Sequence, residues 1–133
     1  MTGAQTPPGA SGGLCGANDL VCTGWACAVW CASGFAFATG FSTEHWRPVL
    51  WIASLGVTGA LCLVNAARCH RMHCYITGPV ALIGALLTAL NAASVTHIPW
   101  MHIGWGVVIG FALGFIAEML GGKYARGAAI PPH

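Results

Sequence analysis

The sequence alternates long apolar stretches with short polar ones. The apolar stretches are residues 20–41, 48–67, 75–96 and 98–117. A helix needs roughly 20 apolar residues to cross about 30 Å of hydrocarbon, so each stretch is long enough to span a bilayer. The connections between them are brief, which makes neighbouring helices antiparallel. The pattern therefore predicts an all-α fold, an integral membrane bundle of four transmembrane helices with short loops.

The apolar block lies between two short tails. Residues 1–18 are rich in Gly, Pro, Ser, Thr and Ala, a composition typical of a flexible segment. They contain no Lys or Arg, so the basic start of a cleavable signal peptide is missing. We expect a flexible N-terminal tail at 1–18, a single transmembrane domain at 19–121 and a C-terminal tail at 122–133.

Composition agrees with a lipid environment. The chain is 56% hydrophobic and 6% charged, whereas soluble domains carry about 25% charged residues. Its five basic residues are too few for the phosphate contacts that nucleic-acid binding needs. We do not expect an enzyme. The three carboxylates are not within helical reach of one another, and no nucleophile or phosphate-binding motif is present.

Basic residues set the predicted orientation. One side of the bundle, with the two termini and the second loop, carries Arg68, Arg71, Lys123 and Arg126, and the other carries Arg47 alone. By the positive-inside rule, both termini and the second loop are expected in the cytoplasm, with the helices in the plasma (inner) membrane.

Tryptophan and glycine positions fit this arrangement. Amphipathic rings are enriched at membrane interfaces, and the outer interface is expected to hold Trp46, Trp51, Trp100 and Trp105. Small residues at four-residue spacing share one helix face and let helices approach closely. The second predicted helix has this spacing at Gly56 and Ala60, and the fourth has it at Gly106, Gly110 and Gly114. We expect helix contacts at these positions.

Soft-metal ligands are concentrated between the second and third predicted helices. Residues 68–74 read Arg-Cys-His-Arg-Met-His-Cys. Thiols, imidazoles and a thioether bind soft or borderline ions such as Cu(I), Zn(II) and Hg(II), and the neighbouring arginines favour the thiolate, which is the ligand. Cys69 and Cys74 are expected to hold one ion, with His70 or His73 as a further ligand. The alternative is a basic loop whose cysteines and histidines bind nothing.

Two other sets of candidates lie elsewhere along the chain. Cys27 and Cys31 are four residues apart, hence on one face of the first helix, where they are either ligands or small packing residues. Cys62 is expected only to pack. The predicted outer loops contain candidates for the capture of a cation, or simple interface residues: His45, His97 and His102.

Glu118 is an ionisable residue near the cytoplasmic end of the fourth predicted helix. A charged group is costly there unless it faces protein or water. We expect it to face other helices or water and to belong to an ion path. The alternative is that its side chain reaches the membrane surface.

The cysteine placement resembles that of the small mercuric-ion transport proteins of bacterial mercury-resistance systems. Cys27 and Cys31 would match that family's pair in the first helix, and Cys69 and Cys74 its pair at a cytoplasmic loop. The family's first pair is typically adjacent, whereas three residues separate Cys27 from Cys31. The resemblance implies Hg(II) handed inward by thiolate exchange toward a cytoplasmic reductase. Met72 and the histidines also suit copper.

The sequence therefore predicts a membrane protein that binds a soft ion, Hg(II) or Cu(I), and passes it between Cys and His sites. One alternative is a small accessory subunit of a larger respiratory or copper-dependent membrane complex. Another is a haem protein whose axial ligands are two of His45, His73, His97 and His102. A unit this small has little room for a pathway of its own, so a homo-oligomer or a larger complex is expected.

Overall fold

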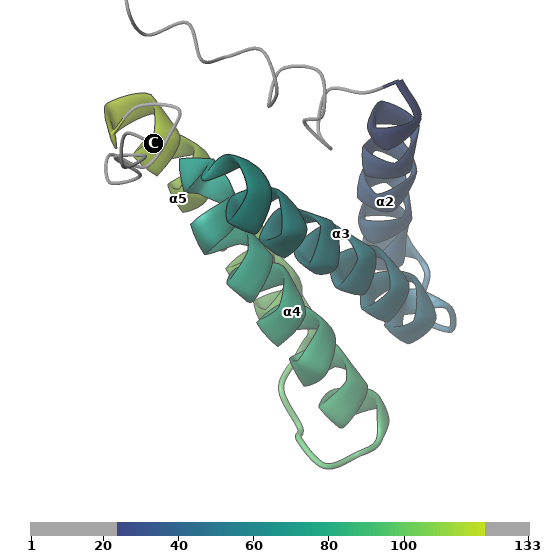
Figure 1. The fold of residues 1–133 in the computed structure, drawn as a ribbon. Coiled ribbons are helices and arrows are strands. Elements are labelled where there is room, and N and C mark those ends of the chain that lie inside the picture. Colours follow the sequence, from purple (N-terminus) through teal and green to yellow (C-terminus); the bar gives the residue numbers. More distant parts are fainter. Residues whose placement is uncertain (1–23, 122–133) are drawn as a thin grey trace, which may run out of the picture.

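The computed structural model describes residues 24–121, which form four α-helices joined by short connections (Figure 1). Their bounds are Gly24–Ser42 for α2, Arg47–Cys69 for α3, Met72–Ala92 for α4 and Trp100–Gly121 for α5. The all-α prediction is confirmed. The predicted tails at 1–18 and 122–133, with Lys123 and Arg126, lie outside the described residues.

Three of the described helices are long and apolar enough to cross a membrane, namely α3, α4 and α5. In α2 the apolar part is shorter and runs over Ala26–Ser42. The beginning of the first predicted span, at residues 20–23, lies outside the described residues. Large apolar side chains such as Leu86, Ile109 and Leu120 are exposed on the outside of the bundle. The exterior is therefore suited to lipid.

Consecutive helices pack against one another in antiparallel fashion. α3 contacts α2 and α4, and α4 contacts α5. In Figure 1, α2 lies against one end of α3, while α4 and α5 run together from the opposite end. Contacts join the start of each helix to the end of its predecessor. Cys62 in α3, for example, meets Thr77 in α4. The antiparallel arrangement expected from the brief connections is therefore confirmed.

Trp51 is the centre of the packing at the α2–α3 end of the bundle. Its side chain is fully buried, and its indole N–H donates a 2.9 Å hydrogen bond to the carbonyl oxygen of Phe37. The rings of Phe37 and Phe41 lie 5.3 and 5.1 Å from the indole. The indole therefore packs inside the bundle, because the C-terminal half of α2 supplies both its apolar contacts and its polar partner. Its predicted depth at the outer interface stays a prediction.

Glycines allow α4 and α5 to approach closely. A Cβ at Gly110 would lie 2.6 Å from Val80 Cγ1, and one at Gly114 would lie 2.8 Å from Thr77 Cγ2. Both distances are too short for a real Cβ contact, so the predicted packing role is confirmed at these two positions. At the other two glycines with four-residue spacing, no atom of the described part of the chain lies within 4 Å of such a Cβ: Gly56 and Gly106.

The segment between α3 and α4 differs from the predicted loop. α3 continues to Cys69, His70 adopts the left-handed conformation at φ 51° and ends the helix, and α4 begins at Met72. His73 and Cys74 therefore lie in the first turn of a helix. The prediction of a loop over 68–74 was wrong because polar residues were assumed to face water, whereas here several of them face neighbouring helices.

Gly104 offers a test of the close packing around Trp51. A Cβ there would lie 2.7 Å from Phe41 Cζ and 2.8 Å from Trp51 Cη2. Gly104→Ala is expected to destabilise the protein by about 1–3 kcal/mol, as overpacking of a core typically does. Gly106→Ala is the matched control, since its Cβ meets no atom within 4 Å. The measurement is thermal unfolding in detergent. Equal melting temperatures for the two variants would contradict the packing described.

Candidate functional site

A group of polar side chains is buried where the end of α3, the start of α4 and the end of α5 meet. We call it the polar cluster. Its members come from three helices and are Cys62, Asn65, Arg71, His73, Cys74, Thr77 and Glu118. Polar groups removed from water need partners within the protein. The cluster therefore forms a connected set of hydrogen bonds and ion pairs.

Cys74 lies at the centre of the polar cluster and has no exposed surface. Its Sγ is 3.3 Å from His73 Nε2 and accepts a hydrogen bond from Asn65 Nδ2 at 3.6 Å. Asn65 is itself 1% exposed, and its Oδ1 has no hydrogen-bond partner among residues 24–121. An amide N–H directed at sulfur favours the thiolate, so the surroundings of Cys74 suit a thiolate ligand.

Cys62 is the second thiol of the polar cluster. It is 1% exposed, and its Sγ lies 3.3 Å from the hydroxyl oxygen of Thr77. That hydroxyl donates its own proton to the carbonyl oxygen of His73 at 2.9 Å, so the Cys62 thiol is the donor to Thr77. Cys62 and Cys74 also belong to one cluster of buried side chains. The two thiols thus lie on the two helices that meet at the α3–α4 contact.

His73 joins the thiols to a carboxylate on α5. Its Nδ1 pairs with Glu118 Oε2, and the other oxygen of that carboxylate lies 3.4 Å from Arg71 Nη2. The His73 ring stacks on Phe115, with centroids 5.1 Å apart and planes 18° apart. Glu118 is largely buried and faces α4, so the prediction that it faces other helices rather than lipid is confirmed.

A cavity of about 310 Å³ lies beside the polar cluster. Polar side chains of the cluster form one part of its wall, including Cys62, His73 and Glu118. The other part is aromatic and consists of Trp30, Phe111 and Phe115. A buried thiol, an imidazole and a carboxylate thus share one cavity that is otherwise apolar, the kind of place where ligand sites form.

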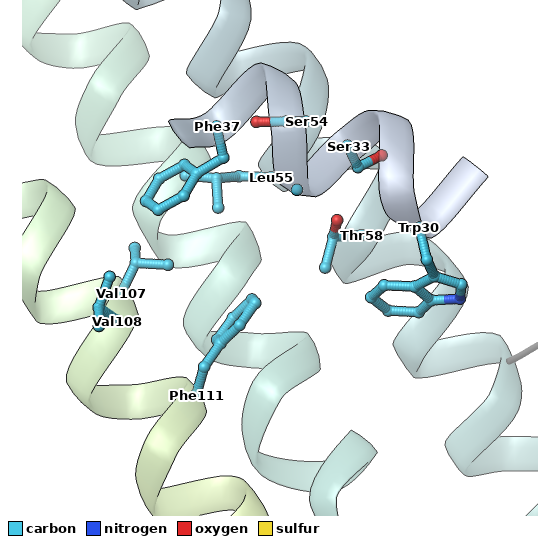
Figure 2. A pocket seen from close by; sticks show the side chains of 10 residues that line it. Trp30, Ser33, Phe37, Ser54, Leu55, Thr58, Val107, Val108 and Phe111 are labelled. Carbon is cyan, nitrogen blue, oxygen red and sulfur yellow. The ribbon is translucent and has the colours of Figure 1, made fainter. Parts of the chain in front are cut away.

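A second cavity, of about 230 Å³, lies nearer the middle of the bundle between α2, α3 and α5. Figure 2 shows Trp30 and Phe111 at different sides of this cavity, with Ser33, Ser54 and Thr58 on the α2–α3 side. Trp30 and Phe111 also line the cavity beside the polar cluster. The two cavities are therefore neighbours that share two aromatic walls.

The structure separates the histidines and cysteines that were predicted from residues 68–74. His73 and Cys74 are buried together, whereas His70 is exposed and its Nδ1 lies 2.8 Å from the hydroxyl of Tyr75. The side chain of Cys69 lies outside the described residues, so its pairing with Cys74 stays a prediction.

The remaining predicted ligands lie away from the polar cluster. Cys27 and Cys31 are exposed on α2 and line neither cavity. The three outer candidates are exposed in or beside the connections at the opposite end of the bundle: His45, His97 and His102. Their roles as ligands stay predictions.

Sequence reasoning did not assign three members of the polar cluster to the site: Cys62, Asn65 and Thr77. A helical spacing could have indicated them. Cys62 and Asn65 are three residues apart, hence on the same face of α3, and Thr77 is one turn beyond His73. Cys62 was expected only to pack because a lone cysteine in an apolar helix has the character of a small hydrophobic residue.

Within residues 24–121, no three His, Cys, Asp or Glu side chains are already arranged to hold a metal ion together. Two donors, Cys74 Sγ and His73 Nε2, are adjacent at 3.3 Å. Bonds of about 2.3 Å to sulfur and about 2.0 Å to imidazole nitrogen would span that distance at an angle of about 100°. An ion that replaces the thiol proton fits between these two atoms after an opening of a few tenths of an ångström.

No protein-family model matches the sequence, and no curated protein or solved structure matches it. The resemblance to mercuric-ion transport proteins therefore rests on cysteine placement alone.

Arg71 offers a test of the ion pairs that hold α5 against α4. Arg71→Ala is expected to lower the free energy of unfolding by about 1.5–3 kcal/mol, the usual contribution of a hydrogen bond to a charged group. The reason is that, among residues 24–121, Glu118 then keeps only His73 as a polar partner. Arg68→Ala serves as the control, since Arg68 is exposed on the last turn of α3. Unfolding in detergent provides the measurement. A smaller loss for Arg71→Ala than for Arg68→Ala would contradict this role.

Proposed function

We propose that this protein is a multi-pass membrane protein that binds a soft metal ion, Cu(I) or Hg(II), at Cys74 and His73 and passes it across the membrane. The observation that carries the proposal is the position of the Cys74 thiol. It has no exposed surface, lies 3.3 Å from an imidazole nitrogen and belongs to the same buried cluster as a second thiol, Cys62. Thiolate and imidazole are donors that soft ions prefer.

The number of donors favours Cu(I) or Hg(II) over Zn(II). Structural zinc sites take four protein ligands in a tetrahedron, and the polar cluster offers two adjacent donors with Cys62 as the third. Soft d¹⁰ ions are stable with two or three ligands. Rotation of the Cys62 side chain away from Thr77 would complete a three-coordinate site of two sulfurs and one nitrogen. Asn65 would then donate its N–H to a metal-bound sulfur.

Transport needs the ion to reach and leave this site. In the proposal, α2 is the fourth membrane-spanning helix, both termini and the α3–α4 turn are cytoplasmic, and the protein lies in the plasma membrane. The exposed histidines at the other end of the bundle would capture the ion first. Cys27 and Cys31 are exposed and line neither cavity, so a pathway through them requires a neighbouring copy of the chain or a partner subunit.

Matched cysteine and histidine variants test the proposal. Protein purified anaerobically and supplied with Cu(I) is expected to retain about one ion per chain, in keeping with a single buried site. Cys74→Ser and His73→Asn should lose most of it, because they remove the adjacent sulfur and nitrogen donors. Cys31→Ser and His70→Asn are the controls and should retain it, since both side chains are exposed.

The result that contradicts the proposal is a stoichiometric amount of Cu(I) on Cys74→Ser. Circular dichroism identifies any variant that has lost its helices. If Cys74→Ser is unfolded, the Cu(I) content of His73→Asn tests the site instead. The same proteins in sealed vesicles test transport, with wild type expected to accumulate Cu(I) and Cys74→Ser to accumulate little. Cys69→Ser examines the predicted pairing of Cys69 with Cys74, since loss of the ion in that variant would add Cys69 to the ligands.

A further inference from the structure

We infer that Glu118 is a positioning residue that holds the His73 ring with its Nε2 lone pair directed at Cys74, a role that rests on the proposed metal-binding function. The three groups form a continuous line. Glu118 Oε2 pairs with His73 Nδ1, and His73 Nε2 lies 3.3 Å from Cys74 Sγ. Carboxylate–histidine–metal arrangements of this kind orient ligands at metal sites.

The partners of the two His73 ring nitrogens determine which nitrogen carries the proton. A carboxylate only accepts hydrogen bonds, so His73 Nδ1 must carry the proton that it shares with Glu118. In a neutral imidazole the other nitrogen, Nε2, then has a free lone pair. In the metal-free protein this lone pair accepts the proton of the Cys74 thiol, whose Sγ lies 3.3 Å away. In the proposed complex it faces the ion that replaces this proton.

Neighbouring side chains hold the carboxylate and the ring in place. Arg71 Nη2 lies 3.4 Å from Glu118 Oε1, the oxygen that does not contact His73. Phe115 is one helical turn before Glu118 and stacks on the His73 ring at 5.1 Å. One face of α5 therefore supplies both the carboxylate that pairs with the ring edge and the aromatic plane that covers the ring.

The placement of Glu118 is unfavourable for a residue that only stabilises α5. Negative charge at the C-terminal end of a helix opposes the helix dipole, and a carboxylate within an apolar helix is costly. Glu118 lies three residues before the end of α5, within a candidate membrane span. Its polar partners among residues 24–121 are the guanidinium of Arg71 and the imidazole of His73. Orientation of the His73 imidazole toward the Cys74 thiol accounts for a carboxylate at this position.

The first test uses the metal-free protein and so does not depend on metal binding. Nitrogen-15 NMR of labelled histidine distinguishes a proton on Nδ1 from one on Nε2. Wild-type His73 is expected to carry its proton on Nδ1, and Glu118→Ala is expected to shift it largely to Nε2, the tautomer that free imidazole side chains favour. Glu118→Gln keeps an acceptor oxygen and should lie between the two. Met119→Ala, at an exposed neighbouring position, should resemble wild type.

The second test measures Cu(I) affinity by competition with a chelator. Loss of an orienting partner typically lowers metal affinity 10–100-fold, and a decrease of about that size is expected for Glu118→Ala, a smaller one for Glu118→Gln and none for Met119→Ala. Unchanged affinity together with an Nδ1 proton in Glu118→Ala would overturn the positioning role. If wild type binds no Cu(I), the proposed function fails, and the NMR result alone then decides whether Glu118 orients His73.

Discussion

The carboxylate of Glu118 lies inside an apolar helix bundle because the beginning of α4 supplies it with two partners, Arg71 and His73. Without them, a carboxylate on a side chain that is only 17% exposed would face a large desolvation cost. The pairing of Glu118 with these two partners has two structural consequences. It fixes the end of α5 against the start of α4, and it fixes the imidazole of His73 beside Cys74. The chemistry of the site thus depends on the satisfaction of one buried anion.

Packing at the opposite end of the bundle sets the register that makes these contacts meet. Trp51 fills the space between the end of α2 and the start of α5, where Gly104 leaves room for its ring. Farther along, Gly110 and Gly114 let α5 approach α4. Because the helices are stiff, a shift at Trp51 would be carried along α5 to Glu118. Apolar packing at one end therefore positions polar chemistry at the other.

The hydrophobic pattern was enough to predict the helices, because long apolar stretches have few stable arrangements in lipid other than helices. It misplaced the boundary at residues 68–74, because hydropathy records how polar a residue is and not whether its partner is water or another helix. Contacts such as His73 with Glu118 join residues far apart in the sequence. No local spacing reveals such a contact. The spacing of Cys62 and Asn65 indicates that they share one face of α3, but it does not show that this face meets Thr77 and Cys74 of α4.

X-ray absorption spectroscopy of the Cu(I)-loaded protein tests the central claim most directly, because it identifies the atoms bound to the ion. Two sulfur ligands and one imidazole nitrogen are expected for wild type. They would come from Cys74 and His73, whose donor atoms are 3.3 Å apart, and from Cys62, which lies in the same buried cluster as Cys74. His73→Asn should lose the nitrogen signature and keep the sulfur. A wild-type spectrum without sulfur ligands, or one that Cys74→Ser leaves unchanged, would contradict the account.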